Sequence, residues 1–253
     1  MSNSCERNWF ETGGSEYSKY RPKYPSSLVS YLTKLAPETE LAVDVGCGTG
    51  QLTKLLANTF NTVMGFDPSN DQLANADPDP HITYQCAPAE ELPIENSCAS
   101  LVTAAQAAHW FNLHEFYQEV RRITLPGGIL ALISYGVLSL EPHLDNMFQE
   151  FYWNDLSPYW PPERTLVDTG YASIEFPFEE LHPPSFEIRV QWDLPELFGY
   201  LLTWSAIRKA REAGKQNFLQ KFTEDLSKAW GDDNVQRTIV WPINMRVGKV
   251  NPD

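Results

Sequence analysis

The sequence contains few basic residues. Lysine and arginine together number 19, against 33 aspartate and glutamate residues, so the 253-residue chain carries a formal net charge of -14. An electrostatic field of that sign repels nucleic-acid phosphates and anionic lipid headgroups. Nucleic acids and membrane surfaces are therefore not predicted as partners.

Long apolar runs are also missing. The longest apolar stretch covers residues 128–140 and is interrupted by Ser134, Tyr135 and Gly136, whereas a membrane-spanning helix needs roughly 20 apolar residues. Residues 1–11 are polar and lack the basic-then-apolar order of a secretory signal. This pattern predicts a cytoplasmic protein.

Cysteine pairs and metal-binding patterns are scarce too. The four cysteines form no Cys-x-x-Cys pair, so they are predicted to be reduced thiols. His109 and His114 are five positions apart, and His114-Glu115 is not followed by the second histidine of a zinc-binding helix. No metal site is predicted.

The first half of the chain has a regular pattern. From residue 41 onward, short apolar runs alternate with segments of helical period, as in βα units on a parallel sheet. Strands are predicted at 41–45, 62–67, 82–86, 100–104 and 129–135. Helices are predicted at 49–58, 69–76 and 112–124, and the last helix is expected to end before Pro126-Gly127-Gly128. The pattern indicates an α/β fold with a doubly wound, mostly parallel sheet.

The second half is less regular and rich in aromatic residues, which make up 13% of the chain. Helical patterns cover 194–213 and 217–230, and strand-like patterns cover 186–191 and 235–247. Two further strands would complete a seven-stranded sheet, with helical cap insertions in the C-terminal half. Since the chain is 42% hydrophobic and shows no linker or repeat, it is predicted to form one domain.

A glycine-rich turn follows the first predicted strand. Gly46, Gly48 and Gly50 allow the backbone to approach a ligand closely, where a Cβ atom would collide. A dinucleotide-binding loop would have its third glycine at position 51, where this chain has Gln51, and this disfavours a nicotinamide oxidoreductase. No Gly-Lys-Ser/Thr follows, so an adenosine ligand without phosphate fits better than a nucleotide.

Two aspartates accompany this turn. Asp67 ends the second predicted strand, 23 positions beyond Asp44, and its carboxylate can accept hydrogen bonds from both hydroxyls of a ribose. The alternative for Asp67 is an N-cap aspartate before Pro68 and Ser69. Asp44, inside an apolar strand, would either support the turn or bind a ligand ammonium group.

Four segments resemble the successive motifs of class I S-adenosylmethionine-dependent methyltransferases. They are residues 44–50, Gly65-Phe66-Asp67, residues 89–93 and residues 125–128. Residues 17–25 and 106–111 further resemble the small-molecule branch that includes trans-aconitate and cantharidic acid methyltransferases. The resemblance implies a Rossmann-like domain over 1–253. Its parts would be an N-terminal arm or lid and first helix (1–40), a cofactor-binding core (41–135), and the cap helices and last strands (136–253).

The resemblance implies S-adenosylmethionine as the cofactor. It assigns Gly46, Cys47 and Gly48 to the methionine part, Asp67 to the ribose, Ala89 with Glu90 to the adenine edge, and Gln106 to the sulfonium. The full predicted set is Tyr17, Asp44, Gly46, Cys47, Gly48, Asp67, Pro68, Ala89, Glu90 and Gln106. The family often has an acidic residue at the position of Ser100. The absence of that acid would reduce the affinity for the cofactor.

The predicted catalytic residue is His109. It lies just beyond the fourth predicted strand and would orient the acceptor or take its proton, and the alternative is a histidine packed beside Trp110 and Phe111. The predicted substrate-contacting residues are Arg21, His109, Trp110 and Trp204. Arg21 would pair with a carboxylate, and the tryptophans would form apolar walls.

Three functions are compatible with these features. The first is methyl transfer from S-adenosylmethionine to a small-molecule carboxylate, giving a methyl ester. An ionised carboxylate needs no general base, since the protein has mainly to align the reacting atoms and exclude water. The second is methylation of another O, N or C acceptor. The third is a non-catalytic, cofactor-binding partner protein, because the motifs indicate binding and not turnover.

Overall fold

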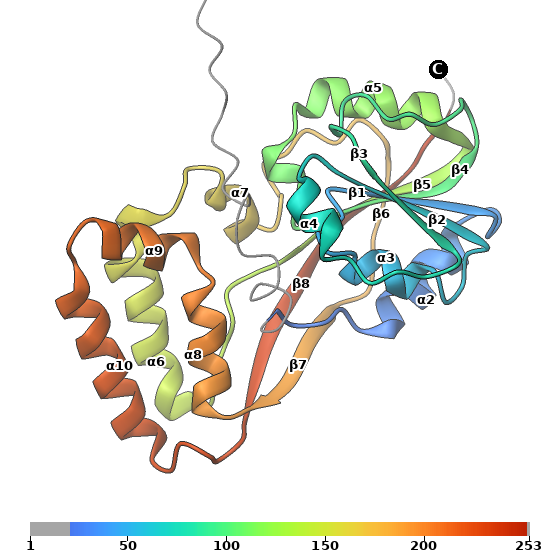
Figure 1. The fold of residues 1–253 in the computed structure, drawn as a ribbon. Helices are drawn as coiled ribbons and strands as arrows, with labels where there is room; N and C mark the ends of the chain where they lie inside the picture. The colour runs from blue at the N-terminus through green and yellow to red at the C-terminus, as the bar shows by residue number, and fades with distance from the viewer. Residues whose placement is uncertain (1–20, 252–253) are drawn as a thin grey trace, which may run out of the picture.

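A mixed β-sheet forms the centre of the molecule in a computed structural model that describes residues 21–251 (Figure 1). Five parallel strands run in the order β3-β2-β1-β4-β5. Their bounds are β1 (Leu41–Val45), β2 (Thr62–Asp67), β3 (Ile82–Cys86), β4 (Ala99–Ala105) and β5 (Thr124–Tyr135). The order reverses between β1 and β4, so the sheet is doubly wound as predicted.

Three antiparallel pairings complete the sheet. The long strand β8 (Arg237–Lys249) pairs with β5, with β6 (Glu179–Leu181) and, along its first half, with β7 (Phe186–Trp192). The sheet therefore has eight strands. The prediction of seven missed β6, because three residues are too few to show a period.

Strand β5 also begins earlier than predicted. Thr124 already pairs with Ala99, and an irregularity then shifts the register before Leu101 pairs with Ile129. Gly127 takes a positive φ of 79° and donates its N–H to the carbonyl of Val250. The segment Pro126-Gly127-Gly128 is therefore part of an irregular strand. It does not form the predicted break between helix α5 (Leu113–Ile123) and strand β5.

Helices cover both faces of the parallel strands. Helices α2 (Ser26–Leu35) and α3 (Gln51–Leu56) lie on one face, and α5 (Leu113–Ile123) lies on the other (Figure 1). Within β5, Ala131 and Ile133 join the core on the α2 face, whereas Leu130 and Leu132 join the core on the α5 face. This alternation follows from the two-residue period of a strand. Helix α4 (Asn70–Ala74) connects β2 to β3.

A helical cap lies beside the sheet and is reached through β7 and β8 (Figure 1). It consists of α6 (Pro142–Glu150), α8 (Leu194–Leu202), α9 (Ser205–Glu212) and α10 (Gln216–Trp230), with α7 (Arg164–Asp168) between it and the core. Buried aromatic residues of the cap share one apolar cluster with the α2 face of the sheet. Burial of that shared surface attaches the cap to the core.

The single helix predicted at 194–213 is wrong, because the structure has two helices there. Helix α8 ends at Leu202, and the hydroxyl of Thr203 donates to the carbonyl of Tyr200 over 2.6 Å. Trp204 takes an extended conformation at the N-cap of α9, and its side chain is buried. The hydroxyl of Thr203 thus bonds to the preceding helical turn. Because the next residue, Trp204, is extended, the helical hydrogen bonds are interrupted there.

Within residues 21–251, no helix has an apolar segment long enough to cross a bilayer.

Candidate active site

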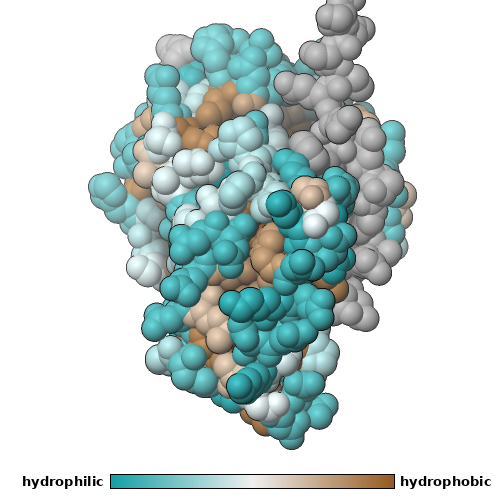
Figure 2. Space-filling model, turned by 90° about the vertical axis from the view of Figure 1, so that its left-hand side faces the viewer, coloured by the Kyte–Doolittle hydropathy of each residue, from teal (hydrophilic) through white to brown (hydrophobic). Residues whose placement is uncertain are grey.

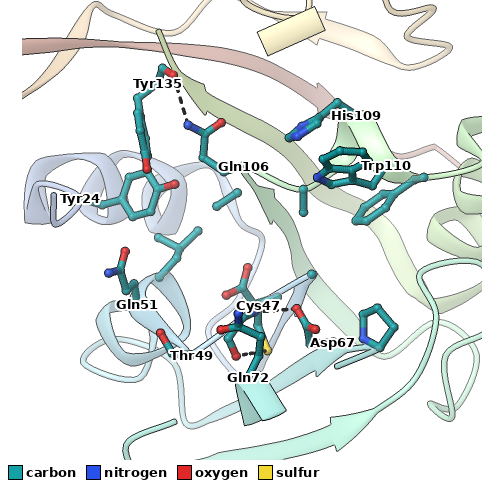
Figure 3. A pocket seen from close by; sticks show the side chains of 18 of the residues that line it. Tyr24, Cys47, Thr49, Gln51, Asp67, Gln72, Gln106, His109, Trp110 and Tyr135 are labelled. Atoms are coloured by element: carbon teal, nitrogen blue, oxygen red, sulfur yellow. Dashed lines mark hydrogen bonds between the residues drawn. The ribbon is translucent and has the colours of Figure 1, made fainter. Parts of the chain in front are cut away.

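A cavity of about 830 Å³ opens at the carboxyl ends of β1, β2, β4 and β5 (Figure 3). This is the point where the strand order reverses, which is where doubly wound sheets bind ligands. The lining residues are Tyr24, Asp44, Gly46, Cys47, Gly48, Thr49, Gln51, Leu52, Asp67, Pro68, Gln72, Ala105, Gln106, Ala107, His109, Trp110, Phe111, Asn112, Tyr135 and Glu163.

The glycine turn has the left-handed backbone that glycine favours. Gly46, Gly48 and Gly50 have φ values of 68°, 56° and 82°. A Cβ atom on Gly46 would lie 2.4 Å from the Cβ of Ala107, so the turn can pack against the segment after β4 only without a side chain there. At Gly48 the nearest atom to such a Cβ is 3.9 Å away, so that position leaves room for a ligand.

Asp67 connects this turn to helix α4. Its Oδ2 accepts the N–H of Gly48 at 2.9 Å, and its Oδ1 accepts the N–H of Ser69 at 2.8 Å. Burial raises the pKa of Asp67, and the two backbone N–H groups partly offset that rise. Each carboxylate oxygen can accept a further hydrogen bond. The N-cap of α4 is Ser69, whose hydroxyl accepts from Gln72, so the N-cap alternative for Asp67 is wrong.

Asp44 supports the site from below the turn. Its Oδ2 accepts the hydroxyl of Thr53 and its Oδ1 accepts the hydroxyl of Thr103, each at 2.7 Å. The side chain is 1% exposed, and burial raises its pKa to about 6. Of the two roles predicted for Asp44, these contacts favour support of the turn.

The raised pKa of Asp44 predicts a pH-dependent stability. Between pH 4 and 6 the folded protein holds a proton on Asp44 that the unfolded chain releases. The free energy of unfolding should therefore fall as pH rises through this range, by about 3 kcal/mol at most. Urea denaturation of wild type and Asp44→Asn at pH 4.5 and 7 tests this, because the difference between the two proteins isolates Asp44 from other titrating groups. A difference that is equal at both pH values would contradict it.

Gln106 has a strained backbone at the end of β4. Its φ is 54°, a left-handed value that non-glycine residues seldom adopt outside functional sites. The side-chain Nε2 donates to the carbonyl of Tyr135 at 3.1 Å (Figure 3). Among the residues that the structure describes, the buried Oε1 atoms of Gln106 and of Gln72 have no hydrogen-bond partner. Both residues line the cavity, so each carries a buried acceptor beside the space where a ligand would bind.

His109 lies on a short 3-10 turn, η1 (Ala108–Trp110). Its Nδ1 is 3.0 Å from the hydroxyl of Tyr171, and its ring lies 4.9 Å from that of Trp110. Burial, together with the charge of Arg164, lowers the pKa of His109 to about 3. The imidazole is therefore neutral near pH 7. So low a pKa disfavours the predicted role of taking a proton. The contacts with Tyr171 and Trp110 agree both with orienting the acceptor and with the packing alternative.

Most of the other predicted residues lie at or behind the cavity wall. Pro68 and Trp110 line it. Arg21 lies behind the wall and donates to the hydroxyl of Tyr135 at 3.0 Å. Ala89 is buried nearby, and Glu90 accepts the N–H of Asn112, a lining residue, at 2.8 Å.

Two positions singled out from the sequence, Trp204 and Ser100, lie away from the cavity. Trp204 packs against Phe148, Tyr152, Trp160 and Tyr200 inside the cap and does not reach the cavity. Ser100 is at the opposite end of β4, where its hydroxyl donates to the carbonyl of Leu41 at 2.8 Å. The position at which the family often has an acid is therefore remote from the cavity. Tyr17 lies outside the described residues.

Several residues that line the cavity were not predicted from the sequence. Tyr135 ends β5, so the rule that parallel strands bind ligands at their carboxyl ends would have found it. Gln72 is on α4, one helical turn beyond Ser69. Tyr24 lies within residues 17–25, for which only the family resemblance was noted, and Glu163 comes from a segment without a motif. Within residues 21–251 no cluster of three or more potential metal ligands occurs.

The fold and the position of the cavity define a Rossmann-like α/β protein of the methyltransferase type. Residues 43–132 match the family described as a methyltransferase domain. A Dictyostelium discoideum protein named as a methyltransferase is 32% identical over 225 residues, which cover 87% of this chain and 86% of that protein. The chain therefore belongs to the S-adenosylmethionine-dependent methyltransferases.

Two further similarities bear on the fold and the branch. A solved structure from Anaeromyxobacter dehalogenans, described as a type II methyltransferase, is 37% identical, with a TM-score of 0.86 over 92% of this chain and 100% of that chain. A trans-aconitate 2-methyltransferase of Variovorax paradoxus is 35% identical over 123 residues, or 46% of this chain and 47% of that protein. The latter match covers less than half of the chain.

Proposed function

We propose that this enzyme transfers the methyl group of S-adenosylmethionine to a small-molecule carboxylate, giving a methyl ester and S-adenosylhomocysteine. The observation that carries the proposal is the convergence of the glycine turn, Asp67 and Gln106 on one cavity. These residues come from the ends of β1, β2 and β4. A ligand bound there would contact all three.

The hydrogen-bonding groups of the cavity fit this cofactor. S-adenosylmethionine carries donors on its ammonium group, its ribose and its adenine amine, and the cavity offers acceptors on Asp67, Gln72 and Gln106. The carboxylates of Asp44, Asp67 and Glu163 line the cavity, and the described lining residues include no lysine or arginine. Such walls favour a sulfonium cation and disfavour the pyrophosphate of a nicotinamide dinucleotide.

We assign the methionine part to the turn at Gly46 to Gly48, the ribose to Asp67 and the reacting end to the neighbourhood of Gln106. When bound, the cofactor supplies a methyl group activated by the positive sulfur, which keeps the bonding electron pair on transfer. The protein contributes alignment: Gln106 is held by Tyr135, and Asp67 fixes Gly48.

Three observations support a carboxylate as the acceptor. A carboxylate is already ionised at pH 7 and needs no base, which agrees with a His109 that does not take up a proton at that pH. Positive charge also lies close to two residues that line the cavity. Arg21 donates to the hydroxyl of Tyr135, and the charge of Arg164 acts on His109. The name of the Variovorax relative, trans-aconitate methyltransferase, likewise indicates a carboxylate.

The acceptor is proposed to be small, and nucleic acids are not proposed as partners. A cavity of about 830 Å³ is near the upper end of the roughly 300–1,000 Å³ of ligand pockets. It therefore suits a cofactor together with a metabolite-sized acceptor. The net charge of -14 opposes binding of a polyanion.

Calorimetric titration with S-adenosylmethionine and separately with NAD tests the cofactor assignment. We expect micromolar binding of the first and no heat from the second. A panel of mono-, di- and tricarboxylates is then assayed for S-adenosylhomocysteine, with matched amines and phenols as controls. Turnover confined to amines or phenols would overturn the carboxylate, and a folded protein that fails to bind S-adenosylmethionine would overturn the cofactor assignment.

A further inference from the structure

A buried tyrosine lies directly behind His109. Tyr171 is 0% exposed, and its hydroxyl is 3.0 Å from Nδ1 of His109, which is 62 positions away in the sequence. The ring of His109 lines the cavity beside Trp110 (Figure 3). Among the described residues, the other ring nitrogen, Nε2, makes no hydrogen bond. The proposed function assigns no role to Tyr171.

The direction of this hydrogen bond follows from the requirement that buried donors be satisfied. Within residues 21–251, the one side-chain partner of the Tyr171 hydroxyl is Nδ1 of His109. If Nδ1 carried the proton, the buried O–H would lack an acceptor among the described residues, and an unsatisfied buried donor is destabilising. The hydroxyl therefore donates to Nδ1, and in the neutral ring the proton is on Nε2.

The backbone holds Tyr171 firmly in this position. Its N–H donates to the carbonyl of Leu166 at 2.8 Å, and its carbonyl accepts from Arg246 at 3.1 Å. Gly170 and Tyr171 both have a φ of 62° and close the C-terminus of α7, which packs against η1. A bulky residue such as tyrosine seldom adopts a left-handed backbone, and in this conformation the hydroxyl reaches His109.

A charged group nearby keeps the ring neutral. Arg164 is fixed by its Nε, which donates to Asp168 and to the hydroxyl of Tyr152, each at 2.9 Å. Its positive charge and the burial of the ring both oppose protonation of His109. The groups around the ring are thus Arg164 and Tyr171 from the α7 segment, with Glu163 on the same cavity wall.

We propose that Tyr171 is a positioning residue that holds His109 as a neutral tautomer, with an Nε2–H donor presented to the cavity. This donor would bind one oxygen of the acceptor carboxylate while the other oxygen takes the methyl group. The role in catalysis rests on the proposed function. The tautomer does not, because it follows from contacts within the protein.

The test is nitrogen-15 NMR of histidine-labelled protein, without cofactor or acceptor. The His109 signals are identified by their loss in His109→Gln among the five histidines of the chain. We expect a protonated Nε2, an unprotonated Nδ1 and no titration between pH 5 and 8. A proton on Nδ1, or titration near pH 6.5, would overturn the proposal.

The Tyr171→Phe variant tests the tyrosine itself. The Nδ1 signal should move to the position of a nitrogen without a hydrogen bond. The matched control is Tyr117→Phe, which loses a buried tyrosine hydroxyl that donates to the carbonyl of Glu175 at 2.8 Å, and should leave the His109 signals unchanged. Thermal unfolding checks that both variants fold. A Nδ1 signal unaffected by Tyr171→Phe, or shifted equally by Tyr117→Phe, would remove Tyr171 from its positioning role.

Discussion

Replacing Asp67 with alanine should weaken S-adenosylmethionine binding at least 100-fold. The carboxylate holds the N–H groups of Gly48 and Ser69, and under the proposed function it also accepts from the ribose. A hydrogen bond to a charged group contributes about 1.5–3 kcal/mol, so the loss of two corresponds to two or more orders of magnitude in affinity. Calorimetric titration of wild type and variant measures the change.

The matched control for this substitution is Asp71→Ala. Asp71 is an exposed residue of α4, four positions from Asp67, and does not line the cavity. Its replacement should leave the affinity within about twofold, since isolated surface charges contribute little. Equal losses in the two variants would indicate a general charge effect and would contradict the assignment of the ribose to Asp67.

Replacing Gly46 with alanine should lower the free energy of unfolding by about 2–5 kcal/mol and abolish cofactor binding. The left-handed backbone costs an alanine roughly 1–2 kcal/mol. The added Cβ would lie 2.4 Å from the Cβ of Ala107, and such overpacking costs about 1–3 kcal/mol more. Relief of the clash would displace the segment that carries Gln106. Urea denaturation and calorimetry measure the two effects.

Gly214→Ala separates the two causes. Gly214 has a φ of 70°, close to the 68° of Gly46, but an added Cβ would have no atom within 4 Å. It should therefore show the backbone cost alone and retain cofactor binding. If both variants lose the same stability, the contact with Ala107 has no energetic consequence, and the packing argument for the turn fails.

Much of the core fold could be predicted from local sequence. The predicted bounds of β1, β2 and β3 agree with the structure, because each strand is a short apolar or alternating run between turn residues. The doubly wound α/β class is confirmed. The short strand β6 and the break between α8 and α9 were missed, because pairing with β8 and burial of Trp204 depend on distant residues.

The cavity was predictable to a similar degree. Asp67, Gln106 and His109 line it because residues that follow parallel strands meet at one edge of the sheet. Their roles toward a ligand stay predictions. Trp204 was expected at the substrate and instead lies in the cap, since composition indicates an aromatic cluster without saying which side chains face inward.

The sequence by itself determined the strand pattern, the glycine turn and the identity of the acid that follows the second strand. These features depend on neighbouring residues, through hydrophobic period and backbone conformation. Only the tertiary structure decided that Asp44 is held by Thr53 and Thr103, that Arg21 reaches Tyr135 and that Tyr171 lies behind His109. The physical reason is that burial and hydrogen-bond partners come from segments that only folding brings together.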